Sequence, residues 1–85
     1  MHGMSAHGTS VERTVRSVVC RQLRIRPDSL THDVDLRDLG VDDEDALQVI
    51  VEVERELDVR FPDDFLDGVR TYGDLASAVR IAVGE

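Results

Sequence analysis

Residues 38–57 read DLGVDDEDALQVIVEVEREL and contain the clearest helix of the chain. Beyond Gly40, apolar residues recur with the spacing of one broad helical face, while carboxylates crowd the start and the outer side. Asp42 is the expected N-cap, and Asp45 three residues later gives a weaker form of the capping box. The helix dipole stabilises acids at 43–45, so this cluster need not be a metal site. The expected apolar face consists of Ala46, Leu47, Val49, Ile50, Val51, Val53 and Leu57.

Two further amphipathic helices flank this one. The first is expected from residue 11, with Ser10 as its N-cap, and Pro27 is expected to end it. Its apolar stripe consists of Val11, Val15, Val18, Val19 and Leu23. The last begins at Thr71, has Asp74 at capping-box spacing and is closed by Gly84. Its inward residues are expected to be Leu75, Ala78, Val79 and Ala82, with Tyr72 at its head.

The connections complete an all-α prediction. Four apolar residues predict that the long first loop is pinned to the core, and Gly40 allows a sharp entry into the next helix. These four are Leu30, Val34, Leu36 and Leu39. A short helix is expected at 63–67, after Pro62. We therefore expect a disordered leader at 1–10 and one domain at 11–85, a four-helix bundle of three main helices and one short helix.

Charge excludes several classes of partner. The 85 residues include 18 acids and 10 basic residues, a net charge of -8, which disfavours nucleic acids and anionic membranes and favours basic protein partners. Residues 31–67 hold 14 acids and three arginines, a balance of -11, so the acidity belongs to the central helix and its flanking loops. A cluster of acidic residues of this kind is also typical of a solvent-exposed surface without a partner.

No apolar run has the length of a signal peptide or membrane span. We expect a cytoplasmic monomer.

Chemistry-bearing residues are sparse. Cys20 is the only cysteine and is expected to be packing material rather than a nucleophile. The carboxylates at 43–45 have no histidine base beside them, and residues 33–45 lack the framework of a calcium loop. We expect neither an enzyme nor a metal site.

Four motifs stand in a fixed order along the chain. They are Asp38-Leu39-Gly40-Val41-Asp42, the acidic helix that follows, Phe61-Pro62-Asp63-Asp64, and Val69-Arg70-Thr71-Tyr72-Gly73-Asp74-Leu75. In this order and spacing the chain resembles the acyl carrier protein family, and the resemblance covers nearly everything after Ser10. It implies the family's carrier fold and partners that are enzymes of fatty-acid, polyketide or related biosynthesis.

The resemblance also implies a prosthetic group, and here the sequence departs from the family. The family's pattern places a serine directly after Asp42, where it forms a phosphodiester with 4'-phosphopantetheine. This sequence has Asp43 there and Glu44 in place of the family's leucine. A carboxylate offers no hydroxyl for the arm, so we expect Asp43 not to be modifiable and no phosphopantetheine to be carried there. Asp28-Ser29-Leu30 repeats the family's tripeptide, but Ser29 lies 14 positions earlier, and we interpret it as a loop residue.

Three hypotheses follow. The leading one is a carrier-like interaction module that docks on basic patches of biosynthetic enzymes without carrying acyl groups. The docking carboxylates are expected to be Asp38, Asp42, Asp45, Glu52, Glu54 and Glu56. The second is a genuine acyl carrier whose serine was replaced by Asp43, by engineering or recent loss. The third is an acidic mimic that binds a basic DNA-binding protein, which accounts for the charge but for none of the motifs.

Overall fold

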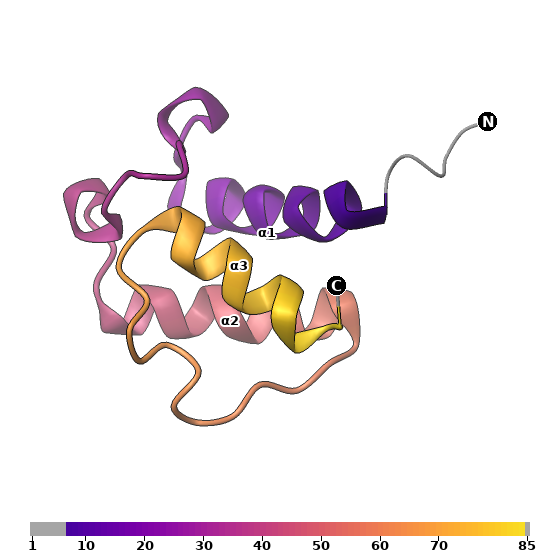
Figure 1. Ribbon diagram of the computed structural model, residues 1–85. Helices are drawn as coiled ribbons and strands as arrows, with labels where there is room; N and C mark the ends of the chain where they lie inside the picture. The colour runs from indigo at the N-terminus through magenta and orange to yellow at the C-terminus, as the bar shows by residue number, and fades with distance from the viewer. Residues whose placement is uncertain (1–6, 85) are drawn as a thin grey trace.

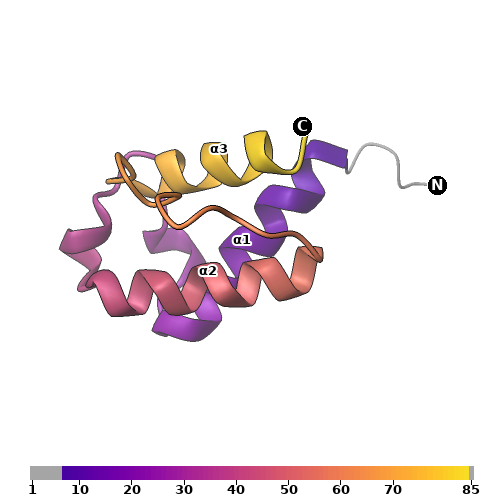
Figure 2. The ribbon, with the colours of Figure 1, turned by 90° about the horizontal axis from the view of Figure 1, so that it is seen from below.

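The computed structural model describes residues 7–84 and confirms the predicted all-α class. Three α-helices run from His7–Leu23 (α1), Asp43–Leu57 (α2) and Tyr72–Ala82 (α3). Two 3-10 helices, Pro27–Ser29 (η2) and Leu36–Leu39 (η3), interrupt the first loop. α1 packs against both α2 and α3, and the segment between α2 and α3 returns along the outside of the bundle (Figures 1 and 2).

The first helix differs from the prediction at both ends. It begins at His7, so Ser10 lies inside the helix instead of capping it, and residues 7–10 are helical rather than part of a leader. The rest of the predicted leader, residues 1–6, lies outside the described residues. At the other end, Arg24 adopts a left-handed conformation with φ 57°, and the Ile25 amide donates to the Cys20 carbonyl at 3.1 Å. This termination ends α1 before Pro27 can do so.

The prediction of a short helix at 63–67 is wrong. Residues 63–68 form successive turns, in which the Phe65 amide donates to the Pro62 carbonyl and the Asp67 amide to the Asp64 carbonyl, each at 3.0 Å. Five residues make too few hydrogen bonds to repay helix nucleation. Gly68 then adopts a φ of 83°, which ends the run of turns.

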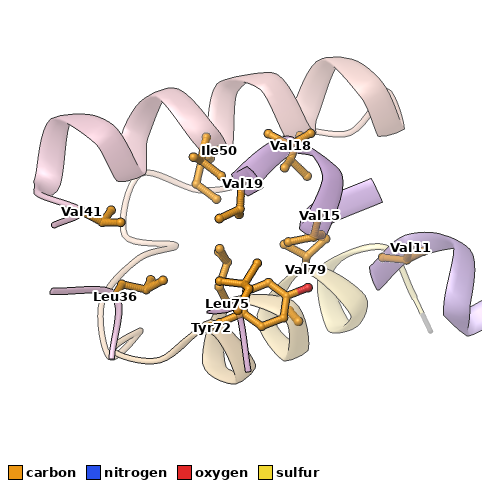
Figure 3. Packing of buried hydrophobic residues seen from close by; sticks show 14 residues of the cluster. Val11, Val15, Val18, Val19, Leu36, Val41, Ile50, Tyr72, Leu75 and Val79 are labelled. Atoms are coloured by element: carbon orange, nitrogen blue, oxygen red, sulfur yellow. The ribbon is translucent and has the colours of Figure 1, made fainter. Parts of the chain in front are cut away.

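One apolar core joins the three helices (Figure 3). The stripe predicted for α1 is confirmed, since four of its valines are buried and Leu23 packs against them. The first loop is pinned as predicted, with Leu30 and Leu36 buried and Val34 and Leu39 packed against the core. Tyr72, the only tyrosine, is fully buried. Burial raises the pKa of its phenol to about 12, although the nearby Arg16 cation acts in the opposite direction.

Some residues expected to face the core do not. Leu47 and Val51 of α2 are 56% and 50% exposed. In α3, Ala82 is exposed and Ala76 is buried instead. Both helices bury a narrower face than their apolar content suggests, because each meets the rest of the bundle from one side.

Arg16 fastens the first loop to α1. Its Nη1 atom donates to the Leu30 carbonyl at 2.7 Å and to the Pro27 carbonyl at 3.3 Å, and its Nη2 atom pairs with Glu12 at 3.3 Å. The guanidinium carbon lies 5.0 Å from the centroid of the Tyr72 ring, a cation–π distance. One side chain thus satisfies loop carbonyls and stacks on α3.

The first loop is also paired with the entry to α3. The Leu36 amide donates to the Arg70 carbonyl at 2.9 Å, and the Tyr72 amide donates to the Val34 carbonyl at 3.1 Å. One step further, the Gly73 amide donates to the His32 carbonyl at 2.8 Å. A Cβ atom at position 73 would lie 2.6 Å from that carbonyl oxygen, so only glycine fits without movement of the backbone.

Replacing this glycine tests the pairing. Alanine normally favours a helix over glycine by about 1 kcal/mol. Because the added methyl would collide with the His32 carbonyl, we expect Gly73→Ala to lower the free energy of unfolding by about 1–3 kcal/mol. Chemical denaturation followed by circular dichroism measures this. Ser77→Ala, at an exposed position of the same helix, is the control and should change stability by no more than about 0.5 kcal/mol. A stabilised Gly73→Ala variant would contradict the close approach.

Candidate functional site

The N-terminus of α2 is built by the predicted capping box. The Asp45 amide donates to Asp42 Oδ1 at 2.9 Å, and the Asp42 amide donates back to Asp45 Oδ2 at 3.4 Å. Two backbone amides that have no acceptor within the helix thereby gain one. α3 uses the same device with Thr71 and Asp74, and backbone amides of Arg70 and Thr71 lower the pKa of Asp74 by hydrogen bonding to its carboxylate.

Asp43 is the first residue of α2 and is exposed, as is Glu44 beside it. Within residues 7–84, neither carboxylate makes an ion pair or a side-chain hydrogen bond. Both lie in the first turn, where the positive end of the helix dipole favours negative charge. Within the same part of the chain, no group of three histidine, cysteine, aspartate or glutamate side chains is arranged to hold a metal ion.

A depression of about 250 Å³ lies beside this helix start. Residues of the first loop, α2 and the segment before α3 line it, so its shape depends on the pairing of the two loops described above. The apolar lining consists of Leu36, Val41, Ala46, Leu66 and Val69. The charged lining consists of Asp35, Arg37, Asp42, Asp43 and Arg70. Neither arginine was predicted from the sequence to belong to the site.

Two of the predicted docking carboxylates face α1. Arg21 Nη2 lies 3.3 Å from Glu56 Oε2 and 3.8 Å from Glu52 Oε2, and Arg55 lies 3.8 Å from the other oxygen of Glu52. Glu52 and Glu56 are one helical turn apart, so a single arginine from α1 contacts both. These acids are already partly neutralised within the fold.

Three more have structural contacts of their own. Glu54 is half-buried, and its Oε2 atom accepts a 2.7 Å hydrogen bond from the Phe61 amide, which holds the chain leaving α2. Asp42 and Asp45 form the capping box. Asp38, exposed in η3, is the one of the six whose side chain has no hydrogen bond or ion pair within residues 7–84.

The outward face of α2 has a different composition. Glu44, Gln48, Val51 and Arg55 follow one another at helical spacing along it, and Leu47 lies beside them. At 3.6 residues per turn, Val51 points about 160° away from the buried Val53, so it cannot reach the core. The exposed pair Leu47 and Val51 was missed as a surface feature because the sequence alone does not show which arc of an apolar helix is covered.

The comparisons with known proteins identify the family of this chain. A family model described as "Phosphopantetheine attachment site" matches residues 13–79. The chain belongs to the acyl carrier protein family. The acyl carrier protein of Sulfurovum sp. is 34% identical over 61 residues, which cover 71% of this chain and 81% of the relative. That of Akkermansia muciniphila is 28% identical over 76 residues, covering 88% and 95%.

Carriers of this family normally bear phosphopantetheine, interact with biosynthetic enzymes and are not enzymes themselves. No helix within residues 7–84 is long and apolar enough to cross a membrane.

Two other candidates identified from the sequence lie away from the α2 N-terminus. Ser29 is the last residue of η2, exposed, with its amide donating to the Arg26 carbonyl at 2.9 Å. It therefore belongs to a turn of the first loop and does not begin an α-helix. Cys20 is half-buried, and burial raises the pKa of its thiol against the opposing effect of Arg16, which makes it a poor nucleophile at neutral pH.

The largely apolar space inside the bundle of residues 7–84 is small. The space between Val19, Leu36, Val49 and Leu75 amounts to about 10 Å³. Such a space holds at most one water molecule, so side chains fill this part of the core.

The structural role of Glu54 can be tested directly. Glu54→Ala leaves the half-buried Phe61 amide without its acceptor, and we expect the free energy of unfolding to fall by about 1–2 kcal/mol. Gln48→Ala, on the outward face of the same helix, should change it by no more than about 0.5 kcal/mol. Urea denaturation of the two variants measures both. Equal effects would mean that the hydrogen bond contributes nothing and that Glu54 is free for other contacts.

Proposed function

We propose that this carrier-family chain is an interaction module that docks on basic surfaces of fatty-acid or polyketide-type biosynthetic enzymes and carries no phosphopantetheine. The observation behind the proposal is the identity and position of Asp43. It is the exposed first residue of α2, next to an intact capping box, in the register where the family's motif has its serine. The helix start is thus preserved for recognition, whereas the hydroxyl that would take the arm is missing.

The absence of a replacement hydroxyl supports the same proposal. No serine or threonine lies in residues 32–70, which include all of α2 and its capping residues. Ser29 belongs to η2, a different element of the first loop. A transferase that recognises the start of α2 therefore meets only carboxylates there.

The outward face of α2 is the best candidate for docking. Leu47 and Val51 offer apolar area, and Asp43 and Glu44 offer carboxylates without partners among the described side chains. An apolar centre with charged groups at its edge is the usual anatomy of a protein interface. Glu52 and Glu56, which already contact Arg21, would contribute less, because a partner must compete with that arginine.

The second candidate, a genuine carrier whose serine was replaced, is supported by the preserved capping box and by the similarity to acyl carrier proteins. The variant Asp43→Ser separates the two. Efficient loading of this variant would mean that the recognition surface of a carrier is intact and that one substitution removed the activity. A folded variant that still competes for the transferase but is not loaded would mean that Glu44 and its neighbours have diverged from the attachment motif, as the interaction module requires.

A competition assay tests docking itself. A broad phosphopantetheinyl transferase loads a serine-bearing acyl carrier protein from coenzyme A, and this chain is added as competitor. We expect it to slow loading. Glu44→Lys combined with Leu47→Ser should weaken the inhibition about tenfold, because an attractive charge becomes repulsive and the apolar contact is lost. Inhibition by the unaltered chain should weaken as the salt concentration is raised.

The matched control is Asp28→Lys, a charge reversal at an exposed position of η2 away from α2. It should inhibit as well as the unaltered chain. No inhibition by the unaltered chain, or equal loss with Asp28→Lys, would contradict docking through the outward face of α2.

A further inference from the structure

A basic segment stands out in this acidic chain. Residues 13–27 contain five arginines and no acidic residue, although the whole chain has a net charge of -8. The five are Arg13, Arg16, Arg21, Arg24 and Arg26. A balance of +5 within 15 residues therefore lies beside the most acidic part of the molecule.

The fold gathers most of this charge on one face. Arg13, Ser17 and Cys20 recur at helical spacing on the side of α1 opposite the buried Val15 and Val18. Arg24 is exposed at the left-handed turn that ends this helix. Arg21 flanks this row, and Arg26 follows just after the helix. We call the exposed surface formed by Arg13, Ser17, Arg21, Arg24 and Arg26 the arginine face.

Most of the arginine face lacks internal counter-charges. Within residues 7–84, no carboxylate lies within 4.0 Å of the guanidinium groups of Arg13, Arg24 or Arg26. Arg16, by contrast, is held by Glu12 and by loop carbonyls, so it belongs to the fold rather than to this surface. Three cations are thus exposed and available to an external partner.

A shallow hollow of about 460 Å³ lies within this face. Arg13, Arg16 and Arg21 line it together with Ser17, Cys20 and Pro27. Cys20, Pro27 and the aliphatic parts of the arginine side chains provide apolar surface between the charges. The hollow can therefore receive an apolar side chain whose neighbours are acidic.

We propose that the arginine face docks an acidic α-helix of a partner protein. The geometry is already used once within the chain, because Arg21 contacts Glu52 and Glu56, two carboxylates one turn apart on α2. From Arg13 to its end at Leu23, α1 rises about 15 Å, or nearly three helical turns, and Arg24 lies directly beyond that end. A partner helix of similar length, with carboxylates repeated at four-residue spacing, matches this row in both charge and length.

A compact acidic helix fits better than the other polyanions. A nucleic acid or an anionic membrane extends beyond three helical turns and would bring its phosphates near residues 31–67, which carry -11. An acidic helix can confine its charge to the arginine face. The same repulsion disfavours a second copy of this chain, which also carries -8.

Binding of a defined probe tests this proposal. The probe is a fluorescent, blocked, alanine-based helical peptide of about four turns with glutamates at four-residue spacing, and its match has glutamines instead. Fluorescence anisotropy at low salt should show that the full chain binds the glutamate peptide at least about tenfold more tightly than the glutamine peptide. Amide shifts in the NMR spectrum should map the contact to α1.

Variants locate the surface. Arg13→Glu combined with Arg24→Glu should weaken binding at least about tenfold, since two attractive contacts become repulsive. Arg60→Glu, an exposed arginine beyond α2, should change it less than about twofold. Circular dichroism confirms that each variant is folded.

Four results would overturn the proposal. The first two are equal binding of the two peptides, and an equal loss of peptide affinity in the Arg60→Glu variant and the double variant. The third is tighter binding to a DNA duplex or to phosphatidylglycerol vesicles than to the glutamate peptide. The fourth is self-association of the chain that the double variant abolishes. The last would assign the arginine face to a second copy of the chain. Because neither peptide involves Asp43 or the transferase, these outcomes are independent of the proposed function.

Discussion

The pairing of the first loop with the entry to α3 is the constraint on which the α2 N-terminus depends. Two hydrogen bonds join residues 34–36 to residues 70–72, and the Gly73 amide adds a third at the His32 carbonyl. Arg16 fastens the same loop to α1. Once the loop is fixed, the start of α2, Arg37 and Arg70 surround one depression. A loop of this length without such contacts would leave the helix start unplaced, because ordering each residue costs about 1–2 kcal/mol of conformational entropy.

Carboxylates in this chain serve more than one purpose. Asp42 and Asp45 cap α2, and Glu54 holds the chain that leaves it. Acids at 43 and 44 gain from the helix dipole and remain exposed. The negative charge is therefore only partly available to partners, and the arginines of α1 give the surface beside α2 a positive electrostatic character. With both proposals taken together, the chain offers two docking faces of opposite charge.

The sequence predicted what local interactions determine. Both capping boxes depend on residues three apart, and the α1 stripe and the loop leucines follow from apolar spacing, so these were found. The exposure of Leu47 and Val51 was missed, because it depends on which side of α2 the other elements cover. The Arg21 contacts with α2 likewise arise between segments 31 and 35 residues apart. The prediction of a short helix at 63–67 was wrong, because the hydrogen bonds of five residues do not offset the free-energy cost of helix nucleation without tertiary support.

Intact mass spectrometry of the unaltered chain is the most direct measurement of the central claim, that a carrier fold stands here without its prosthetic group. The full chain is incubated with coenzyme A and a broad phosphopantetheinyl transferase, with a serine-bearing acyl carrier protein in a parallel reaction as the positive control. The account predicts that the control gains one phosphopantetheine arm and that this chain keeps its mass. A gain of one arm would contradict it, and peptide mapping would then show whether Ser29 or another hydroxyl had accepted the group.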